Sequence, residues 1–247
     1  MERTAICCPN CGAVESVNSV LCHRCGAPLQ AVQVVVRESF WERVTITELL
    51  RRLCIAVFLV TYGLALFSGG RLWEVISPGQ AFQGAIYLLG SLSGPAVLLG
   101  GQWYRLFTAM FLHYGIIHLF FNMVALKVVG PETEQNLGKL RFLVLYLLAG
   151  LFGNLCSLLY FGMRLFQVGA SGAICGLLGA LYMIGRARGG VYGEILRRIT
   201  TRWIVFTILF GAFVPGIDNA AHIGGMVAGA VLVKVLGVRA TRIDRVI

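Results

Sequence analysis

The amino-acid sequence predicts an all-α membrane protein in which six transmembrane helices follow a small cytosolic zinc ribbon. Of the 247 residues, 57% are hydrophobic and 13% charged, and the mean hydropathy is +0.79. A water-soluble protein of this size is less apolar, so we predict an integral membrane protein. The order of the segments predicts a zinc-ribbon domain over 1–30, a connector with an interfacial helix over 31–52 and a six-helix domain over 53–247.

Two CxxC knuckles lie near the amino terminus, CPNCG at 8–12 and CHRCG at 22–26, with ten residues between them. Four thiolates can complete the tetrahedral shell of a structural zinc ion, and a glycine after each knuckle allows a tight turn. The predicted ligands are Cys8, Cys11, Cys22 and Cys25. So small a unit has almost no core, so metal binding would supply its folding free energy. The alternative is a redox dithiol, which normally belongs to a βαβ fold.

The connector is expected to end where the first long helix begins. Thr45-Ile46-Thr47-Glu48 fits a capping box, and Phe40 and Trp41 suit the membrane interface. About fifty residues, rather than a short basic leader, precede the first apolar run. We therefore expect a retained anchor and no cleavable signal peptide.

Windows without charged residues predict the membrane spans. They are Leu53–Gly70, Leu106–Leu126, Phe142–Met163, Leu165–Gly185, Trp203–Ile217 and Asn219–Val233. The stretch 75–104 is long enough to cross once more, but two prolines and six glycines interrupt it. Without that crossing, 18 Lys and Arg lie on the amino-terminal side and three on the other; with it, the numbers are 8 and 13. The positive-inside rule therefore favours six spans, both termini in the cytoplasm, and a re-entrant or interfacial loop at 75–104.

Basic cytoplasmic loops account for the net charge of +10, so no nucleic-acid partner is expected. The expected environment is the lipid bilayer. The absence of a targeting leader and the cytoplasmic basic bias favour a multi-pass protein of a prokaryotic plasma membrane.

Four polar residues are predicted at one depth of the membrane. Spans two, four and six run from outside to inside, which places His118, Asn122, Ser171 and His222 near their outer ends. At about 1.5 Å per residue, the helix 170–185 is shorter than a hydrocarbon layer of about 30 Å, so Ser171 should lie below the outer surface. An ionisable residue at that depth is a functional hypothesis by default.

Two GxxxG pairs, at 172–176 and 225–229, permit close approach of the helices that carry Ser171 and His222. The neutral imidazole could then take the proton of the hydroxyl and return it to the leaving amine. The alternative is that both motifs only pack helices, with Ser171 bonded to a carbonyl of its own helix. Asp218 is the nearest candidate for a third member but equally fits a helix cap. We therefore favour a Ser-His dyad.

His118 and Asn122 are spaced i, i+4 and share a helix face, so both can donate toward an oxyanion together with the amide of Ser171. His113 is expected to support the loop before its helix rather than to catalyse. A metal site of His113, His118 and His222 is conceivable, but no carboxylate joins them and HExxH is absent. No cofactor is therefore expected for catalysis.

In their order and spacing, these residues resemble the rhomboid intramembrane serine proteases over 53–236. The shared motifs are WYRLFT at 103–108, HxxxxHxxxN from His113 to Asn122, Gly130 with Glu134, GASG at 169–172, and Ala221-His222 followed by Gly225 and Gly229. The resemblance implies a six-helix rhomboid bundle with Ser171 as nucleophile and His222 as base. It further implies that His118 and Asn122 form the oxyanion hole and that Arg105 and Glu134 support the structure.

Two positions depart from the family pattern. The family's Trp-Arg pair reads Tyr104-Arg105 in this chain, with Trp103 one place earlier. Cys175 stands four residues after the serine, where relatives usually have an aromatic ring that packs on the catalytic histidine. We therefore expect His222 to be less firmly oriented and the activity to be reduced or differently tuned.

The leading hypothesis is a membrane-embedded serine endopeptidase that cleaves single-pass transmembrane proteins near the outer face, where a substrate helix unwinds easily. The rival is a proteolytically silent rhomboid-like chaperone or adaptor that binds transmembrane helices while the zinc ribbon recruits a cytosolic partner. A transporter is disfavoured because the sequence has no inverted repeat of paired broken spans.

Overall fold

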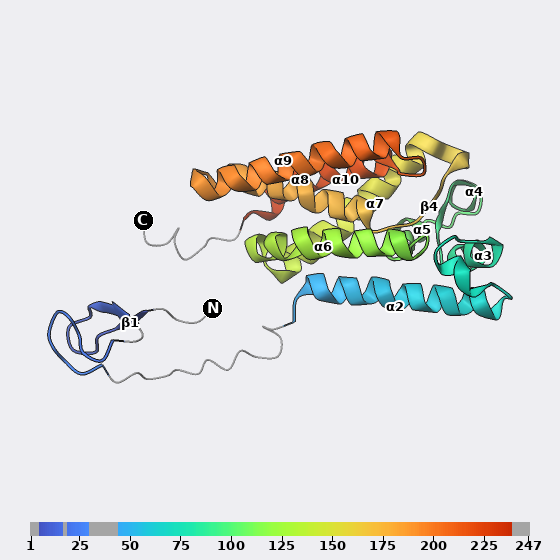
Figure 1. Ribbon diagram of the computed structural model, residues 1–247. Helices are drawn as coiled ribbons and strands as arrows, with labels where there is room; N and C mark the ends of the chain where they lie inside the picture. Colours follow the sequence, from blue (N-terminus) through green and yellow to red (C-terminus); the bar gives the residue numbers. More distant parts are fainter. Residues whose placement is uncertain (1–4, 17–18, 30–43, 239–247) are drawn as a thin grey trace. The chain divides into compact units, whose positions relative to one another are not determined.

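The computed structural model describes residues 5–16, 19–29 and 44–238, and the chain forms two compact units, Met1–Arg43 and Val44–Ile247 (Figure 1). The first unit contains an antiparallel pair of strands, β1 (Ala5–Cys7) and β2 (Val14–Ser16), with Ala5 opposite Ser16. Part of the predicted connector, including Phe40 and Trp41, lies outside the described residues. Its last part, from residue 46 to 52, belongs to the first long helix.

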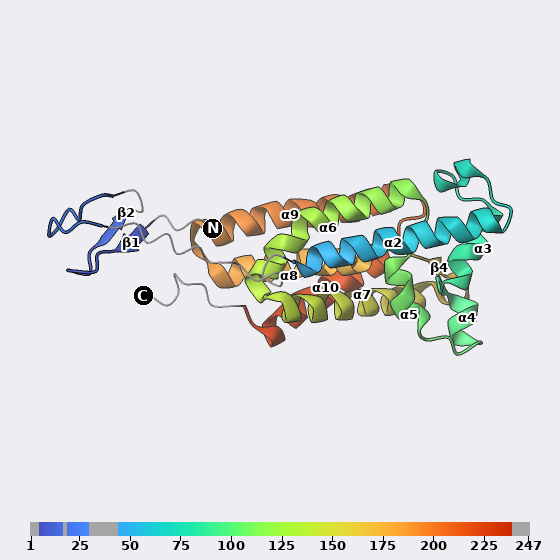
Figure 2. The same ribbon diagram turned by 90° about the horizontal axis from the view of Figure 1, so that it is seen from below.

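The second unit is built on six long helices (Figures 1 and 2). They are α2 (Ile46–Phe67), α6 (Ile116–Leu137), α7 (Lys139–Phe161), α8 (Ser171–Arg188), α9 (Gly190–Phe213) and α10 (Asn219–Leu236). Each overlaps one of the six predicted spans. The helices run back and forth, so α6, α8 and α10 begin at one end of the bundle, which we call the Ser171 end. At the opposite end, the Glu134 end, α2 begins and α6 leads into α7.

Four of the described helical segments are long and apolar enough to cross a membrane by length and composition. They are Ile46–Phe67, Ile116–Leu137, Lys139–Arg164 and Asn219–Leu236. The other two long helices carry charges, with Arg186 and Arg188 in the last turn of α8 and four charged residues among the first 13 of α9. With these apolar helices, the chain is an integral membrane protein.

Helix α8 lies at the centre of the bundle, packed against α6, α7, α9 and α10. It is buried on almost every side, and most of its buried residues are Gly, Ala, Leu or Ile. By contrast, α9 buries only Gly193 and Thr200 along its 24 residues. The small residues of α8 let four neighbours approach it closely, which is the usual way membrane helices pack. This central position fixes the orientation of the first residue, Ser171.

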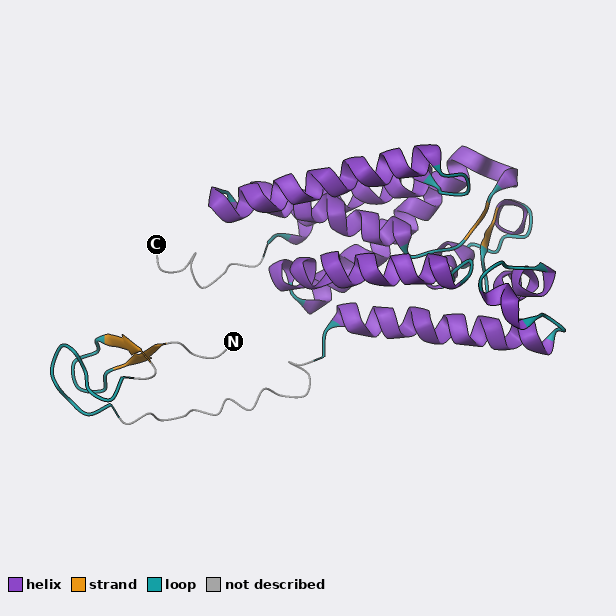
Figure 3. Cartoon of the chain, viewed as in Figure 1, coloured by secondary structure: helices purple, strands orange, loops and turns teal. Residues whose placement is uncertain are grey.

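The stretch 75–104 forms short elements at the Ser171 end and no spanning helix (Figure 3). The elements of this end are η1 (Leu72–Val75), α3 (Gln80–Leu88), β3 (Leu92–Ser93), α4 (Gly94–Leu98), α5 (Arg105–Thr108), η2 (Ala109–Phe111), η3 (Gly162–Arg164) and β4 (Phe166–Gln167). Strand β3 pairs antiparallel with β4, with Leu92 opposite Gln167. The loop is thereby joined to the segment that leads into α8.

Candidate active site

The Ser171 hydroxyl belongs to the first residue of α8, directly after an extended segment. Gly169 has a φ of +136°, and its amide donates to the carbonyl of Ala109 at 2.9 Å. A side chain at Gly169 would place its first carbon 3.7 Å from Ser171 Oγ and only 3.0 Å from His118 Nε2. The positive φ and the close neighbours both exclude a side chain at this position. Gly169 therefore leaves a space that is bordered by the Ser171 hydroxyl and the His118 imidazole.

His118 lies in the first turn of α6 and directs one ring nitrogen toward that space. Its Nδ1 accepts a hydrogen bond of 3.3 Å from the backbone amide of Tyr114. A neutral imidazole whose Nδ1 accepts carries its proton on Nε2. His118 is therefore arranged as a hydrogen-bond donor beside Ser171 Oγ.

Asn122 is buried one turn further along α6. Its Nδ2 donates to the carbonyl of His118 at 2.9 Å, while its buried Oδ1 has no hydrogen-bond partner. A side-chain amide has two N–H donors, so one remains available to a ligand. The structure thus places His118 and Asn122 on neighbouring turns, with part of the Asn122 amide engaged by its own helix.

The two glycine pairs meet face to face in the seam between α8 and α10. A methyl group on Gly225 would overlap the carbonyl oxygen of Gly172, and one on Gly229 would overlap that of Gly176. Of the described elements, α8 and α10 form the most extensive contact. The beginnings of the two helices, with Ser171 and His222, are therefore held together by direct backbone contact.

His222 lies in the first turn of α10, is 7% exposed and is close enough to His118 for electrostatic interaction. Its Nδ1 is buried without a hydrogen-bond partner. Asp218 is the N-cap of α10: its Oδ1 accepts from the amide of Ala221 at 2.9 Å, and its Oδ2 accepts from the hydroxyl of Ser157. Of the two alternatives for Asp218, the structure shows the cap. In the described part of the chain, no carboxylate is hydrogen-bonded to the His222 ring.

His113 packs edge-on against His118, with ring centroids 5.3 Å apart. It is 1% exposed, and neither ring nitrogen has a hydrogen-bond partner. Cys175 is buried inside α8, where it offers a small thiol rather than an aromatic ring. The rings of His113 and His118 are therefore confined by packing more than by hydrogen bonds.

A family model described as the rhomboid domain matches residues 100–239, more than half of the chain. The chain belongs to the rhomboid family. This match confirms the family predicted from the motifs. The matched residues include His118, Asn122, Ser171 and His222.

Three relatives show how far the similarity extends. The rhomboid protease GluP of Bacillus subtilis (strain 168) is 41% identical over 145 residues, 58% of this chain and 28% of GluP. The putative rhomboid protease YdcA of the same organism is 31% identical over 175 residues, 66% of this chain and 88% of YdcA. Inactive RHOMBOID-like protein 8 of Arabidopsis thaliana is 34% identical over 141 residues, 57% of this chain and 40% of that protein. The chain therefore spans less than half of GluP and of the Arabidopsis relative.

Arg105 connects the rhomboid domain to its first loop at the Ser171 end. Its Nε donates to the side-chain oxygen of Gln102 at 2.6 Å, and its Nη1 donates to the carbonyls of Tyr87 and Ser91 at 2.9 Å each. The guanidinium also lies 4.4 Å from the ring centroid of Tyr87 and 5.6 Å from that of Tyr104. The tyrosine that stands in the family's tryptophan position thus still packs on the arginine.

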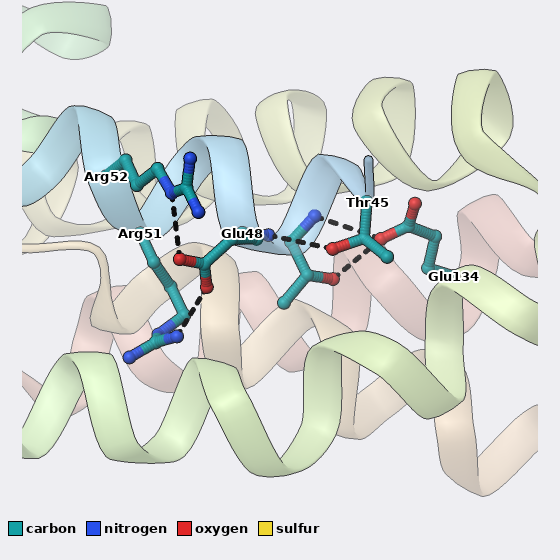
Figure 4. A network of polar contacts seen from close by, with 6 residues as sticks. Thr45, Glu48, Arg51, Arg52 and Glu134 are labelled. Atoms are coloured by element: carbon teal, nitrogen blue, oxygen red, sulfur yellow. Dashed lines mark hydrogen bonds and ion pairs between the residues drawn. The ribbon is translucent and has the colours of Figure 1, made fainter. Parts of the chain in front are cut away.

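Glu134 holds the beginning of α2 at the opposite end (Figure 4). Its carboxylate accepts from the amides of Ile46 and Thr47 at 2.8 and 2.9 Å and from the Thr47 hydroxyl at 2.8 Å. Gly130 makes room for this contact, because a methyl group there would lie 2.5 Å from the Thr47 side chain. The carboxylate accepts hydrogen bonds from amides that have no partner inside the helix. Its negative charge also interacts favourably with the positive end of the helix dipole.

The predicted capping box at the same helix start is half formed. Thr45 accepts from the amide of Glu48 at 3.2 Å, as a capping threonine does. The Glu48 carboxylate instead accepts from Arg51 and from Arg52 (Figure 4). Glu134, from another helix, accepts from the next two amides, those of Ile46 and Thr47, and a local motif does not predict this contact.

A second polar network at the Glu134 end joins α6, α8 and α9. Asn136 donates to Glu132 and, at 3.0 Å, to the Tyr192 hydroxyl, and its Oδ1 accepts from Arg188 Nε at 3.1 Å. The Tyr192 hydroxyl in turn donates to Glu132. Sequence reasoning missed this network because its two parts, 132–136 and 188–192, are separated by more than fifty residues.

Asn154, which the sequence analysis did not single out, joins the loop to the segment before Ser171. It is 2% exposed in the middle of α7; its Nδ2 donates to the carbonyl of Leu106 at 2.8 Å, and its Oδ1 accepts from Gln167 at 3.5 Å. A polar residue inside an apolar span was the available signal.

The four cysteines of the amino-terminal unit converge, with their sulfur atoms all within 4.8 Å of one another. Two of the distances are 3.6 Å, Cys8 to Cys25 and Cys11 to Cys22. Zinc–sulfur bonds of about 2.3 Å in a tetrahedron separate the sulfurs by about 3.8 Å, so the cluster fits a zinc ion. Each knuckle closes in the same way around a glycine with positive φ, +72° at Gly12 and +68° at Gly26.

Backbone amides and one carboxylate shape the electrostatics of the cysteine cluster. The amide of Ala27 and then the side chain of Asn10 lower the pKa of Cys25 to about 6. Burial and the hydrogen bond to Glu15 raise the pKa of Cys22 to about 12. Near neutral pH without metal, Cys25 is therefore largely a thiolate, and Cys22 is a thiol that donates to Glu15 at 3.0 Å.

Proposed function

We propose that the rhomboid domain is an intramembrane serine endopeptidase with a Ser171–His222 dyad. The observation that carries the proposal is the backbone contact between α8 and α10, which brings together the first turns of the two helices that carry Ser171 and His222. Named proteases among the relatives support the same activity.

In the proposed reaction, His222 takes the proton of the Ser171 hydroxyl as the oxygen attacks the scissile carbonyl. The imidazolium then returns the proton to the leaving amine, and water hydrolyses the acyl-enzyme by the same steps. Asp218 forms no hydrogen bond to the His222 ring: its Oδ1 accepts from the amide of Ala221 in the cap of α10, and its Oδ2 accepts from the hydroxyl of Ser157 in α7. We therefore propose a dyad without a hydrogen-bonded acidic third member.

The developing oxyanion is stabilised by donors that are already in place. Nε2 of His118 faces the space beside Ser171 Oγ, and Asn122 retains a free N–H one turn below. The amide of Ser171 adds a third donor at the positive end of α8. Such donors act mainly on the transition state, where the charge appears.

The proposed orientation places the Ser171 end toward the outside and both termini in the cytoplasm of a prokaryotic plasma membrane. Most Lys and Arg of the described helices lie near the Glu134 end, as the positive-inside rule requires. On this orientation α8 and α9 cross the bilayer as well, with their charges near the inner surface. The substrates are then single-pass transmembrane proteins, cut near the outer face at a segment that unwinds easily.

Replacement of the nucleophile tests the proposal. In proteoliposomes with a model single-pass substrate, Ser171→Ala should lower the cleavage rate by about 10⁴-fold or more at unchanged melting temperature, because the remaining donors cannot supply a nucleophile. Ser68→Ala is the control, since that side chain is exposed at the end of α2, and its cleavage rate should equal that of the parent. Equal rates for Ser171→Ala and the parent would contradict the proposal.

A proteolytically silent adaptor is the second candidate, favoured by a relative that is named inactive and by the small thiol of Cys175 in place of an aromatic ring. An adaptor would hold full-length transmembrane partners equally well with Ser171 or alanine and would yield no fragments. The protease predicts that Ser171→Ala traps the same partners while the parent releases two fragments of each.

We also propose that the amino-terminal unit docks a cytosolic partner and that its cysteine cluster binds one structural zinc ion. The ligands of the zinc ion are Cys8, Cys11, Cys22 and Cys25. The pKa of Cys22 is raised in the metal-free cluster, so zinc binding must release a proton from this thiol, and occupancy should fall as the pH is lowered. Metal analysis of the purified full chain at pH 7.5 should return about one equivalent of zinc, and Cys22→Ser should remove most of it. A value below about a tenth of an equivalent in the parent would refute the site.

A further inference from the structure

A groove at the Glu134 end lies between the last turns of α8 and α10. Its volume is about 490 Å³, and its lining includes Met183 and Arg186 of α8 and Val233, Lys234 and Gly237 of α10. The groove therefore combines an apolar floor with two cationic side chains. Helix α8 runs about 22 Å from Ser171 to Arg186 at about 1.5 Å per residue, so the cations lie near the opposite surface of a hydrocarbon layer of about 30 Å.

The two cations have no counter-ion in the part of the chain that the structure describes. Neither Arg186 nor Lys234 forms an ion pair or a hydrogen bond there. Their neighbours at the same end are engaged: Arg51 and Arg52 pair with Glu48, and Arg197 and Arg198 pair with Glu194. With 21 basic and 11 acidic residues in the sequence, the bundle has an excess of positive charge.

A third cation reaches the rim of the groove. Nη1 of Arg141, at the beginning of α7, donates to the carbonyl of Gly237 at 3.3 Å. Each helix end exposes carbonyl groups, and Arg186 and Lys234 suit the negative end of the helix dipole. That attraction accounts for basic residues in the last turns, but not for three of them around one apolar groove. A ligand with an anionic head and an apolar tail satisfies both parts of the groove.

We propose that this groove binds the headgroup of an anionic phospholipid, with the phosphate between Arg186 and Lys234 and the first acyl carbons along Met183 and Val233. Basic pockets between membrane helices at the cytoplasmic surface bind such headgroups. The inference depends on membrane insertion and is independent of the chemistry at Ser171. The lipid bridges the ends of α8 and α10, the two helices that carry the proposed dyad at their other ends.

The test measures lipid retention by the full chain in detergent micelles with native mass spectrometry. Equimolar phosphatidylglycerol and phosphatidylcholine with the same acyl chains are offered. The parent should retain one phosphatidylglycerol in preference to phosphatidylcholine. Arg186→Gln with Lys234→Gln should weaken that binding about 30-fold, and Lys234→Gln alone about 5-fold.

The matched control is Arg52→Gln with Arg198→Gln, which removes the same charge from the same end but on α2 and α9. The control should bind phosphatidylglycerol as the parent does, and all variants should keep the parent's melting temperature in micelles because the exchanged side chains are exposed. Equal binding by parent and double variant, or an equal loss in the control, would overturn the proposal. Displacement of the lipid by excess inorganic phosphate would also overturn it, since it would indicate a site for the free ion.

Discussion

The two ends of the bundle differ in how many of their buried polar atoms have hydrogen-bond partners. At the Glu134 end, the carboxylate of Glu134 and the amide of Asn136 are engaged by donors and acceptors from other helices. At the Ser171 end, polar atoms are left over: of nine buried side-chain atoms without a partner in the described part, seven lie there. They belong to Ser91, His113, Asn122, Gln167, Asn219 and His222. Satisfied polar groups stabilise a fold, whereas unsatisfied ones cost free energy and mark a site for substrate and water.

This contrast predicts that substitutions of the polar side chains that border Ser171 change the rate of cleavage without changing stability. His118→Ala should lower the rate of substrate cleavage by about 10²- to 10³-fold, because it removes a donor aimed at the oxyanion. The melting temperature should stay near that of the parent, since the His118 ring accepts only one long hydrogen bond. A fall in melting temperature with an unchanged rate per folded molecule would reverse the roles assigned to the two ends.

Substitutions at the Glu134 end should do the opposite. Glu134→Gln should lower the free energy of unfolding by about 1.5 to 3 kcal/mol, because a neutral amide cannot accept from all three donors at the start of α2. The control Glu194→Gln removes exposed ion pairs and should cost about 0 to 1 kcal/mol. Steric-trap or thermal unfolding in micelles measures both. If the two variants unfolded alike, the buried carboxylate would have no special role.

The seam between α8 and α10 links the two ends and can be broken by one methyl group. Gly225→Ala forces the new carbon onto the Gly172 carbonyl and should destabilise the protein by about 1 to 3 kcal/mol and displace His222 from Ser171. Gly63→Ala in α2 meets no atom within 4 Å and should instead stabilise by about 0.5 to 1 kcal/mol. Unfolding curves and cleavage rates of the pair test whether the close contact is required.

Much of this arrangement follows from local sequence patterns. Each uncharged window overlaps one of the six long helices, but the window 106–126 begins ten residues before α6 and the window 203–217 begins thirteen residues after the start of α9. Charge counts predicted that 75–104 does not form a spanning helix, and the GxxxG pairs predicted the seam. Thr45 was predicted as a cap because capping depends on residues close in sequence.

Other features depend on contacts between distant segments, which a local pattern does not encode. Three contacts join residues that are far apart in the chain. They are the short pairing of β3 with β4, the hydrogen bond from Asn154 to Leu106 and the contact between Ser157 and Asp218. Asp218 caps α10 through the local bond from the amide of Ala221, whereas its second contact, with Ser157, is seen only in the folded bundle. The lengths of α8 and α9 were also less predictable, because charged residues continue both helices beyond their apolar windows.

The central claim is that the Ser171 hydroxyl and the His222 imidazole act together in a pocket that water reaches. A fluorophosphonate probe reacts with an activated serine, and peptide mapping identifies the labelled residue. We predict labelling at Ser171 in the parent, none in Ser171→Ala, and labelling slowed by at least about 10³-fold in His222→Ala, because the hydroxyl then lacks its base. Labelling of Ser171 at the same rate without His222, or no labelling of the folded parent, would contradict the claim.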